Sequence, residues 1–183
     1  MHHEGRPRIR ICRDGIESSF ETLRGPRRSV ARDASFLLIA TLTCGEESSG
    51  DRGGPDPRAG FVDVTARVTE VVRRSKVATG LCVVFCRHTS ASLLVQENAD
   101  PQVQADLLAW LERIAPDGDR IFRHTAEGKD DMPAHVRSAI TKTSECIPVC
   151  DGDLALGTWQ ALYVLEHRLR GHPRSLVVNV SGD

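Results

Sequence analysis

The sequence predicts an α+β fold: one β-rich domain of largely antiparallel, sandwich-like sheets with two or three helices. The chain has 183 residues, of which 40% are hydrophobic and 27% are charged, values typical of a single globular domain. Most of its predicted strands are joined by local turns, which is the connection expected in antiparallel sheets. Only two or three segments show helical spacing of apolar residues.

The first strands are predicted at residues 36–42 and 61–64. Residues 44–59 are rich in Gly, Pro, Ser and Asp, which predicts a flexible inserted loop between them. Thr65 is expected to cap a helix over residues 66–76. The apolar residues 81–86 then predict a buried strand, because β-branched and other apolar side chains gather there.

The second half begins with a helix at Asp100 and Pro101, since Asp caps free amides and Pro suits the first turn. The residues that follow, up to Ile114, form one apolar stripe along this helix. Asp131 opens a shorter helix. The remaining strands are predicted at residues 146–149, 161–169 and 176–180.

The N-terminal residues 1–33 are predicted to be a disordered Arg-rich extension to a domain at 34–183. They contain eight arginines and five acidic residues, a net charge of +3, whereas the remainder has a net charge of −4. A nucleic-acid or partner arm, or sequence upstream of the true start, are the other interpretations. The mildly acidic domain itself is not expected to bind nucleic acid.

No apolar run approaches the length of a membrane span, and no secretory signal is visible, so a cytoplasmic protein without membrane association is expected. The six cysteines favour buried small side chains over disulfides in that compartment. Cys82 and Cys86 would lie about 13 Å apart on one strand, too far for a disulfide or a shared zinc ion.

Three histidines lie in polar clusters: His88 after a strand, and His124 and His135 on either side of an acidic turn. Converging imidazoles can bind a divalent metal or move protons near neutral pH. Their sequence separations match no short metal motif, so isolated hydrogen-bonded histidines are the alternative. Glu97 and Asn98, before the Asp100 cap, are further candidates, with turn formation as the alternative.

Near the C-terminus, Trp159 can stack on a flat ring and Gln160 can hydrogen-bond to the edge of that ring. Glu166 and Arg168 interrupt an apolar strand, which predicts an ion pair or the border of a polar cleft. Arg168 and Arg174 can offer guanidinium groups to a phosphate. An ordinary core Trp159 and a solvated arginine cluster are the alternatives. The usual nucleotide-loop, serine-hydrolase and zincin motifs are absent.

Four stretches in this order resemble the YjbQ family of small bacterial and archaeal proteins, described as secondary thiamine-phosphate synthases. They are FCRHTSASLLVQENADP, RHTAEGKDDMPAHVRSAI, IPVCDGDLALGTWQALYVLEHR and HPRSLVVNVSGD. The likeness runs from about residue 36 to 182. Residues 1–33 and 44–59 fall outside it, and residues 141–146 are more polar than the corresponding family segment.

The resemblance implies a homotrimer with a polar pocket around His88, His124 and His135, holding a divalent metal such as zinc or magnesium. The implied reaction joins an aminopyrimidine pyrophosphate to a thiazole phosphate and releases pyrophosphate. We assign catalytic roles to the three histidines and Glu97. Contacts with this small phosphorylated substrate are predicted for the following residues: Thr89, Asn98, Asp131, Trp159, Gln160, Glu166, Arg168 and Arg174. A non-catalytic metal- or phosphate-binding trimer and a metal-dependent hydrolase are the competing functions.

Overall fold

The computed structural model describes residues 20–21, 36–44 and 60–183. The predicted extension and inserted loop therefore lie outside the described residues, with two exceptions. Phe20–Glu21 form the short strand β1, and Cys44 ends strand β2 (Phe36–Cys44). Strand β2 is two residues longer than predicted.

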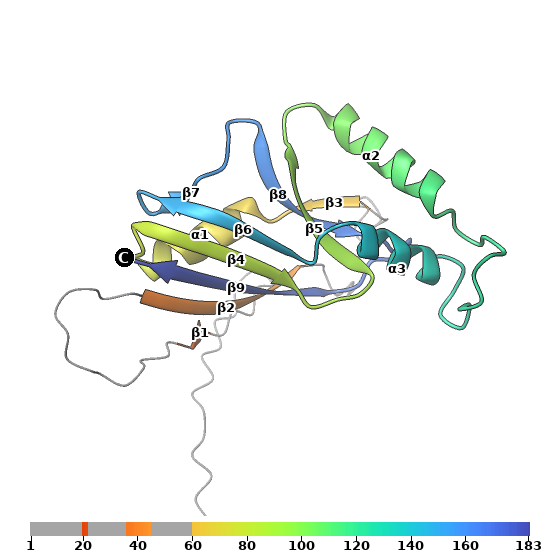
Figure 1. Cartoon of the computed structure of the whole chain (residues 1–183), viewed down its shortest axis with the longest axis horizontal. Coiled ribbons are helices and arrows are strands. Elements are labelled where there is room, and N and C mark those ends of the chain that lie inside the picture. Colours follow the sequence, from red (N-terminus) through yellow and green to blue (C-terminus); the bar gives the residue numbers. More distant parts are fainter. Residues whose placement is uncertain (1–19, 22–35, 45–59) are drawn as a thin grey trace, which may run out of the picture.

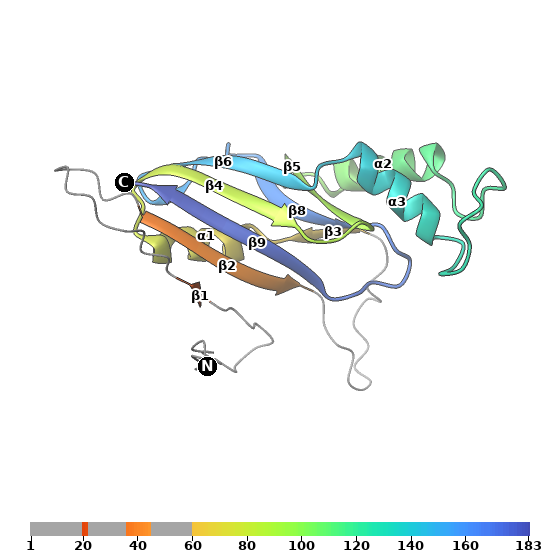
Figure 2. The ribbon, with the colours of Figure 1, turned by 60° about the horizontal axis from the view of Figure 1, so that its bottom comes forward.

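The strands form two sheets in which every pair is antiparallel (Figures 1 and 2). The larger sheet has the order β1-β2-β9-β4-β6-β7, and the smaller has the order β3-β8-β5. The remaining strands are β3 (Gly60–Asp63), β4 (Thr79–Cys86), β5 (Ala91–Glu97), β6 (Ser144–Cys150), β7 (Asp153–Leu154), β8 (Gln160–Glu166) and β9 (Arg174–Gly182). With helices α1 (Thr65–Ser75), α2 (Pro101–Ile114) and α3 (Asp131–Ile140), the predicted α+β domain is confirmed.

The main core lies between the inner face of the larger sheet, α1 and the smaller sheet. Strand β4 contributes Cys82, Val84 and Cys86 to it. Its other face exposes Leu81, Val83 and Phe85, so the predicted buried strand is buried on one face only. The reason is the alternation of side chains along a strand whose second face is not covered in the described part of the chain.

Strand β8 is the central strand of the smaller sheet, and both of its faces are buried. Leu162 and Val164 point into the main core, whereas Tyr163 and Leu165 join a second cluster with Leu111 of α2. The strand ends at Glu166, three residues before the predicted end at residue 169. This burial explains why its sequence is continuously apolar.

Helix α1 begins at Thr65 itself, so Thr65 is not its N-cap as predicted. The cap is Val64, and the Thr65 hydroxyl instead accepts a hydrogen bond from the backbone N–H of Leu162 at 2.9 Å. That hydroxyl is therefore used to attach α1 to β8. The predicted apolar face is confirmed, because Val68, Val71 and Val72 are buried.

Helix α2 starts as predicted, with the Asp100 carboxylate accepting from the backbone N–H of Gln102 and Pro101 in the first turn. Its apolar stripe is only partly buried. Only Leu111 is buried, while Trp110 and Ile114 remain exposed. Of the apolar residues of α2, Leu111 is the one that joins the cluster formed with the smaller sheet.

Helices α2 and α3 lie at one end of the molecule, and the C-terminus lies at the other (Figure 1). The segment that links α2 to α3 includes His124, and α3 opens at Asp131 as predicted. None of the helices in the described residues is long and apolar enough to cross a membrane.

Candidate metal centre

The first residues of α3 and the segment before it place two histidines and one aspartate together. Asp131 and His135 are four residues apart on α3 and therefore lie on the same face of the helix. His124 approaches from the preceding segment. One ligand atom from each of these three residues lies within 4.8 Å of the others, which is a spacing that one metal ion can bridge.

The Asp131 carboxylate is the centre of this group. Its Oδ2 lies 2.8 Å from Nε2 of His124 and 3.4 Å from Nε2 of His135. The two imidazole rings have centroids 5.9 Å apart. The Asp131 side chain is only 2% exposed, whereas His124 and His135 are 47% and 34% exposed. In this group the aspartate is therefore buried, and the two histidines are accessible to solvent.

The orientation of His135 is fixed by a backbone group. Its Nδ1 lies 3.0 Å from the carbonyl oxygen of Thr89, which can only accept a hydrogen bond, so Nδ1 carries the proton. In the neutral ring, Nε2 then has a free lone pair directed toward the Asp131 carboxylate. Such an outer hydrogen bond is typical of histidines that bind metals.

Arg168 holds the other side of Asp131. Its Nη1 donates to Asp131 Oδ1 at 2.5 Å and its Nε donates to Asp130 Oδ2 at 2.9 Å. Burial alone would raise the pKa of Asp130, but hydrogen bonds from Arg168 and the Leu169 N–H outweigh it and lower that pKa. The Asp130 hydrogen bond in turn raises the pKa of Arg168. Arg168 is thus fixed as a cation beside Asp131.

A second buried ion pair supports this arrangement. Arg174 donates from Nε and Nη2 to the two oxygens of Glu166, and both side chains are 7% exposed. Glu166 Oε1 also accepts from the backbone N–H of Arg168. Carboxylates engage both guanidinium groups, so Arg168 and Arg174 hold acidic side chains in this structure. The phosphate contacts expected from the sequence stay a prediction.

His88 is not a member of the group formed by His124, Asp131 and His135. Its Nε2 accepts the backbone N–H of Ser175 at 2.7 Å. Burial and, after it, the charge of Arg174 lower the pKa of His88, which keeps the ring neutral. His88 is nevertheless the chain neighbour of Thr89, whose carbonyl orients His135.

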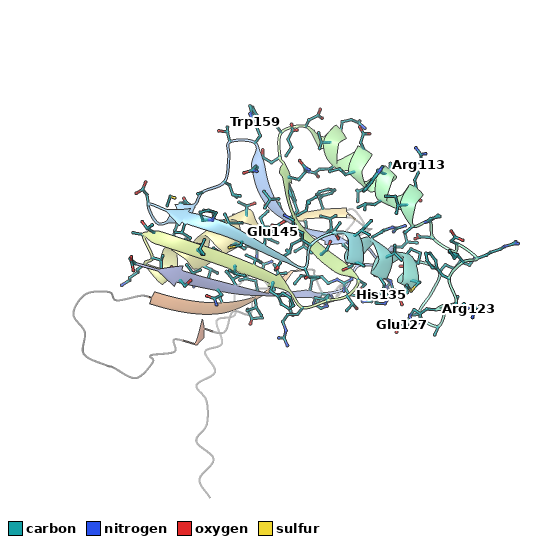
Figure 3. All side chains as sticks on the ribbon, viewed as in Figure 1. Arg113, Arg123, Glu127, His135, Glu145 and Trp159 are labelled. Atoms are coloured by element: carbon teal, nitrogen blue, oxygen red, sulfur yellow. The ribbon has the colours of Figure 1, made fainter. Side chains whose placement is uncertain are left out.

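The other four predicted site residues lie at the opposite end of β8. Glu97 pairs with Gln160 across the smaller sheet, and the backbone N–H of Asn98 donates to the Trp159 carbonyl. Strand β8 has seven residues, so Gln160 lies six residues before Glu166, a distance of about 20 Å at about 3.3 Å per residue. Figure 3 shows Trp159 on the loop before β8 and His135 on α3. One chain therefore does not bring these two groups together.

Trp159 is 65% exposed, so it is not the ordinary core residue that was the alternative interpretation. Gln160 uses its side-chain oxygen to accept from the backbone N–H of Gly157, which stabilises the turn before β8. Among the described residues, Glu97 and Asn98 form hydrogen bonds through their backbone groups and none through their side chains.

Sequence reasoning placed Asp131 among the substrate contacts and not among the candidate metal ligands, and it assigned no site role to the buried residues Arg137 and His167. The spacing of Asp131 and His135 on a predicted helix was a signal for a ligand pair, because residues four apart share a helix face. Arg137 and His167 gave no comparable signal, since their burial depends on contacts between distant segments.

Comparisons with known proteins find relatives of this chain. A family model described as UPF0047 protein YjbQ-like matches residues 54–183. A UPF0047 protein from Synechocystis is 55% identical over 118 residues, covering 64% of this chain and 80% of that protein. UPF0047 protein YjbQ from Salmonella typhimurium is 39% identical over 125 residues, covering 68% and 90%.

Solved structures show the same fold. A YjbQ/UPF0047 family protein from Clostridium acetobutylicum is 33% identical, has a TM-score of 0.62, and covers 78% of this chain and 98% of its own. A YbjQ-like protein from Sulfolobus solfataricus has a TM-score of 0.67 at 21% identity, covering 81% and 99%. The second likeness concerns the fold alone.

Proposed function

Because the chain belongs to the YjbQ-like UPF0047 family, we propose that it is a metal-dependent transferase of the secondary thiamine-phosphate synthase type. The proposed reaction joins an aminopyrimidine pyrophosphate to a thiazole phosphate and releases pyrophosphate. The substrates are thus small phosphorylated metabolites. The observation that carries the proposal is the convergence of His124, Asp131 and His135.

The donor set indicates the class of metal. Two imidazole nitrogens and one carboxylate oxygen suit zinc and similar transition metals, whereas magnesium favours oxygen ligands. Zinc therefore fits these residues better than magnesium. Three protein ligands also leave a coordination position for substrate or water, as in catalytic zinc sites. A bound divalent ion would supply positive charge beside the departing pyrophosphate.

The residues of the chain orient this centre. Thr89 fixes the tautomer of His135, and Arg168 holds the outer oxygen of Asp131. Glu166, itself held by Arg174, fixes the backbone at Arg168. Holding reactants and charges in a fixed geometry accounts for most of the catalysis expected for such a displacement.

The homotrimer and the cytoplasmic location belong to the same proposal. Leu81, Val83 and Phe85 expose 47%, 37% and 46% of their surface on the outer face of β4, which favours coverage by another copy. A trimer would also allow the Trp159 end of one chain to face the metal centre of a neighbour. Four free cysteines in the described part of the chain agree with a reducing compartment.

The test is synthesis of thiamine phosphate from the two precursors by the zinc-loaded protein. We expect His135→Ala and His124→Ala to reduce turnover about 100-fold or more, since each removes a metal ligand. His88→Ala tests the histidine outside the group. His172→Ala, which changes an exposed histidine outside it, is the matched control. Wild-type turnover by folded His135→Ala protein would overturn the proposal.

A metal-dependent hydrolase is the second candidate, favoured by the exposure of His124 and His135. An open coordination position can activate water as readily as it can hold a substrate. Phosphate release from simple esters, without synthesis from the two precursors, would select this function. Bound metal with neither activity would select the binding protein.

A further inference from the structure

The turn between β4 and β5 (residues 87–90) carries the backbone group that orients one candidate metal ligand. In Figures 1 and 2 this turn lies at the end of the molecule that carries α3. Its Thr89 carbonyl accepts from Nδ1 of His135 at 3.0 Å. The side chain of Thr89 is exposed, so its own packing does not hold the residue in place. The position of this carbonyl therefore depends on the contacts of the neighbouring turn residues.

The turn is attached to β9 by an imidazole that replaces a backbone group. The regular pairing of β4 with β9 ends at Cys86 and Leu176. One residue further, the Arg87 N–H still donates to the Ser175 carbonyl at 3.1 Å, as in a continued ladder. The Ser175 N–H, however, donates to Nε2 of His88 at 2.7 Å. His88 thus takes the place of the backbone carbonyl that a ladder would supply, and the chain can leave the sheet while it stays attached to β9.

This contact requires a neutral His88 ring. Nε2 can accept the Ser175 N–H only while it carries no proton, which leaves the ring proton on Nδ1. Burial and, after it, the charge of Arg174 lower the pKa of His88. The accepting form of the ring is therefore the form present at pH 7.

The other side of the turn is held by longer contacts. The Ser90 carbonyl accepts from Nη2 of Arg174 and from the backbone N–H of His167, both at 3.4 Å. Hydrogen bonds of this length lie beyond the usual range for N–H donors, whereas the contact of His88 lies at its short end. His88 is therefore the stronger attachment of the two residues that flank Thr89.

We infer that His88 is a positioning residue for the candidate metal centre. By accepting the Ser175 N–H, it holds the turn so that the Thr89 carbonyl fixes the orientation and the tautomer of His135. The inference rests on the proposed function only for the metal ion that His135 would bind. The hydrogen bond that sets the tautomer of His135 requires neither metal nor turnover.

The experiment compares two substitutions of His88 in the full, metal-free chain. His88→Leu removes the acceptor, whereas His88→Gln offers a side-chain oxygen to the Ser175 N–H. NMR of nitrogen-labelled histidine side chains at pH 8 measures the tautomer of His135. We expect the Nδ1–H tautomer to dominate in the wild type and in His88→Gln, and a mixture of both tautomers in His88→Leu. His172→Leu, which changes an exposed histidine outside the turn, is the control and should leave His135 unchanged.

Zinc affinity is the second readout, measured by competition with a zinc-binding dye. His88→Leu should weaken zinc binding about tenfold or more, because it removes a group that orients a ligand. His88→Gln should stay within about threefold of the wild type, since the acceptor is kept. In cobalt-loaded protein, His88→Gln should retain the wild-type visible absorption, because a positioning residue supplies no ligand atom to the metal.

A further variant covers the case in which His88→Leu does not fold. His88→Asn keeps a polar side chain, but its amide is one methylene shorter than that of Gln and should not reach the Ser175 N–H. It should therefore show the same mixture of His135 tautomers and the same loss of zinc affinity as expected for His88→Leu.

An unchanged His135 tautomer and an unchanged zinc affinity in the folded variant without the acceptor would overturn the inference and leave the proposed function standing. Zinc binding as weak in His88→Gln as in His88→Leu, or an altered cobalt absorption, would also overturn it, because the imidazole itself would then be required. A tautomer shift in His88→Leu, together with a wild type that does not synthesise thiamine phosphate, would support the inference and count against the proposed function.

Discussion

The buried ring of His167 links folding to pH. Its pKa is about 4 in the folded chain against 6.5 for an ordinary histidine, mainly because burial disfavours the charged form. The unfolded chain therefore binds a proton near pH 6.5 that the folded chain binds only near pH 4. The stability that this difference contributes is complete above pH 6.5 and is lost as the pH falls toward 4.

We predict that His167 alone makes the free energy of unfolding about 2 kcal/mol lower at pH 5 than at pH 7. Urea unfolding of the wild-type protein and of His167→Asn at the two pH values measures it. Asn can keep a hydrogen bond to Ser92 but does not titrate. The same loss in both proteins would mean that His167 does not carry this pH dependence.

Arg168 acts on the metal centre through Asp131 rather than by direct contact. Arg168→Gln should weaken zinc binding about 10- to 100-fold, because the buried carboxylate loses the partner that fixes its outer oxygen. Arg168→Lys should restore part of the affinity. Arg170→Gln, at an exposed position two residues away, is the control. An unchanged zinc affinity in folded Arg168→Gln would show that the hydrogen bond from Arg168 to Asp131 is not needed for metal binding.

The chemistry of these residues could be predicted from the sequence, but their partners could not. Polar clusters at a strand end and a helix start indicated His88, His124 and His135 as candidates. The sequence could not reveal that Asp131, rather than His88, completes the group, since this depends on how α3 meets the segment before it. Nor could it reveal that Glu166 would engage Arg174 across eight residues.

Strands β4 and β9 approach so closely at their ends that only glycine fits. A side chain at Gly80 would place its Cβ 2.1 Å from the backbone oxygen of Ser181, and Gly80 pairs with Gly182 across the sheet. Neither backbone can move without disturbing the ladder. Gly80 is the second residue of β4.

We predict that Gly80→Ala lowers the free energy of unfolding by about 2 kcal/mol or more. At Gly157 a Cβ would meet only the flexible side chain of Gln160 at 3.3 Å, so Gly157→Ala should change stability by about 0.5 kcal/mol or less. Denaturant titrations of both variants compare them. Equal stability of the two would contradict the close approach of β4 and β9.

Helix α2 shows why the presence of a helix is easier to predict from sequence than the burial of its side chains. The Asp100 cap and the spacing of apolar residues are local properties, so the helix begins where expected. How many of those residues are buried depends on the surface that the helix meets. Within this chain that surface covers Leu111 and leaves Trp110 55% exposed.

At the scale of the whole molecule, the exposed apolar face of β4 bears on the oligomeric state. We predict that the wild-type protein has about three times the 20.1 kDa mass of one chain, and that Phe85→Glu shifts it toward a single chain. A charge on this face would be buried in the trimer at a high free-energy cost. Sedimentation equilibrium measures the masses.

Val62→Glu is the control for that experiment, because Val62 is similarly exposed at 42% but belongs to β3 of the smaller sheet. It should leave the mass unchanged. A trimer that persists in Phe85→Glu would place the contact between copies elsewhere on the surface.

The central claim is that His124, Asp131 and His135 hold one divalent metal ion. The most direct measurement is competition between the metal-free protein and a zinc-binding dye, with wild type, His124→Ala, His135→Ala and His172→Ala compared. One zinc ion per chain is predicted for the wild type and for His172→Ala, with affinity about 100-fold weaker in the other two. Equal zinc affinity in all four folded proteins would contradict the account.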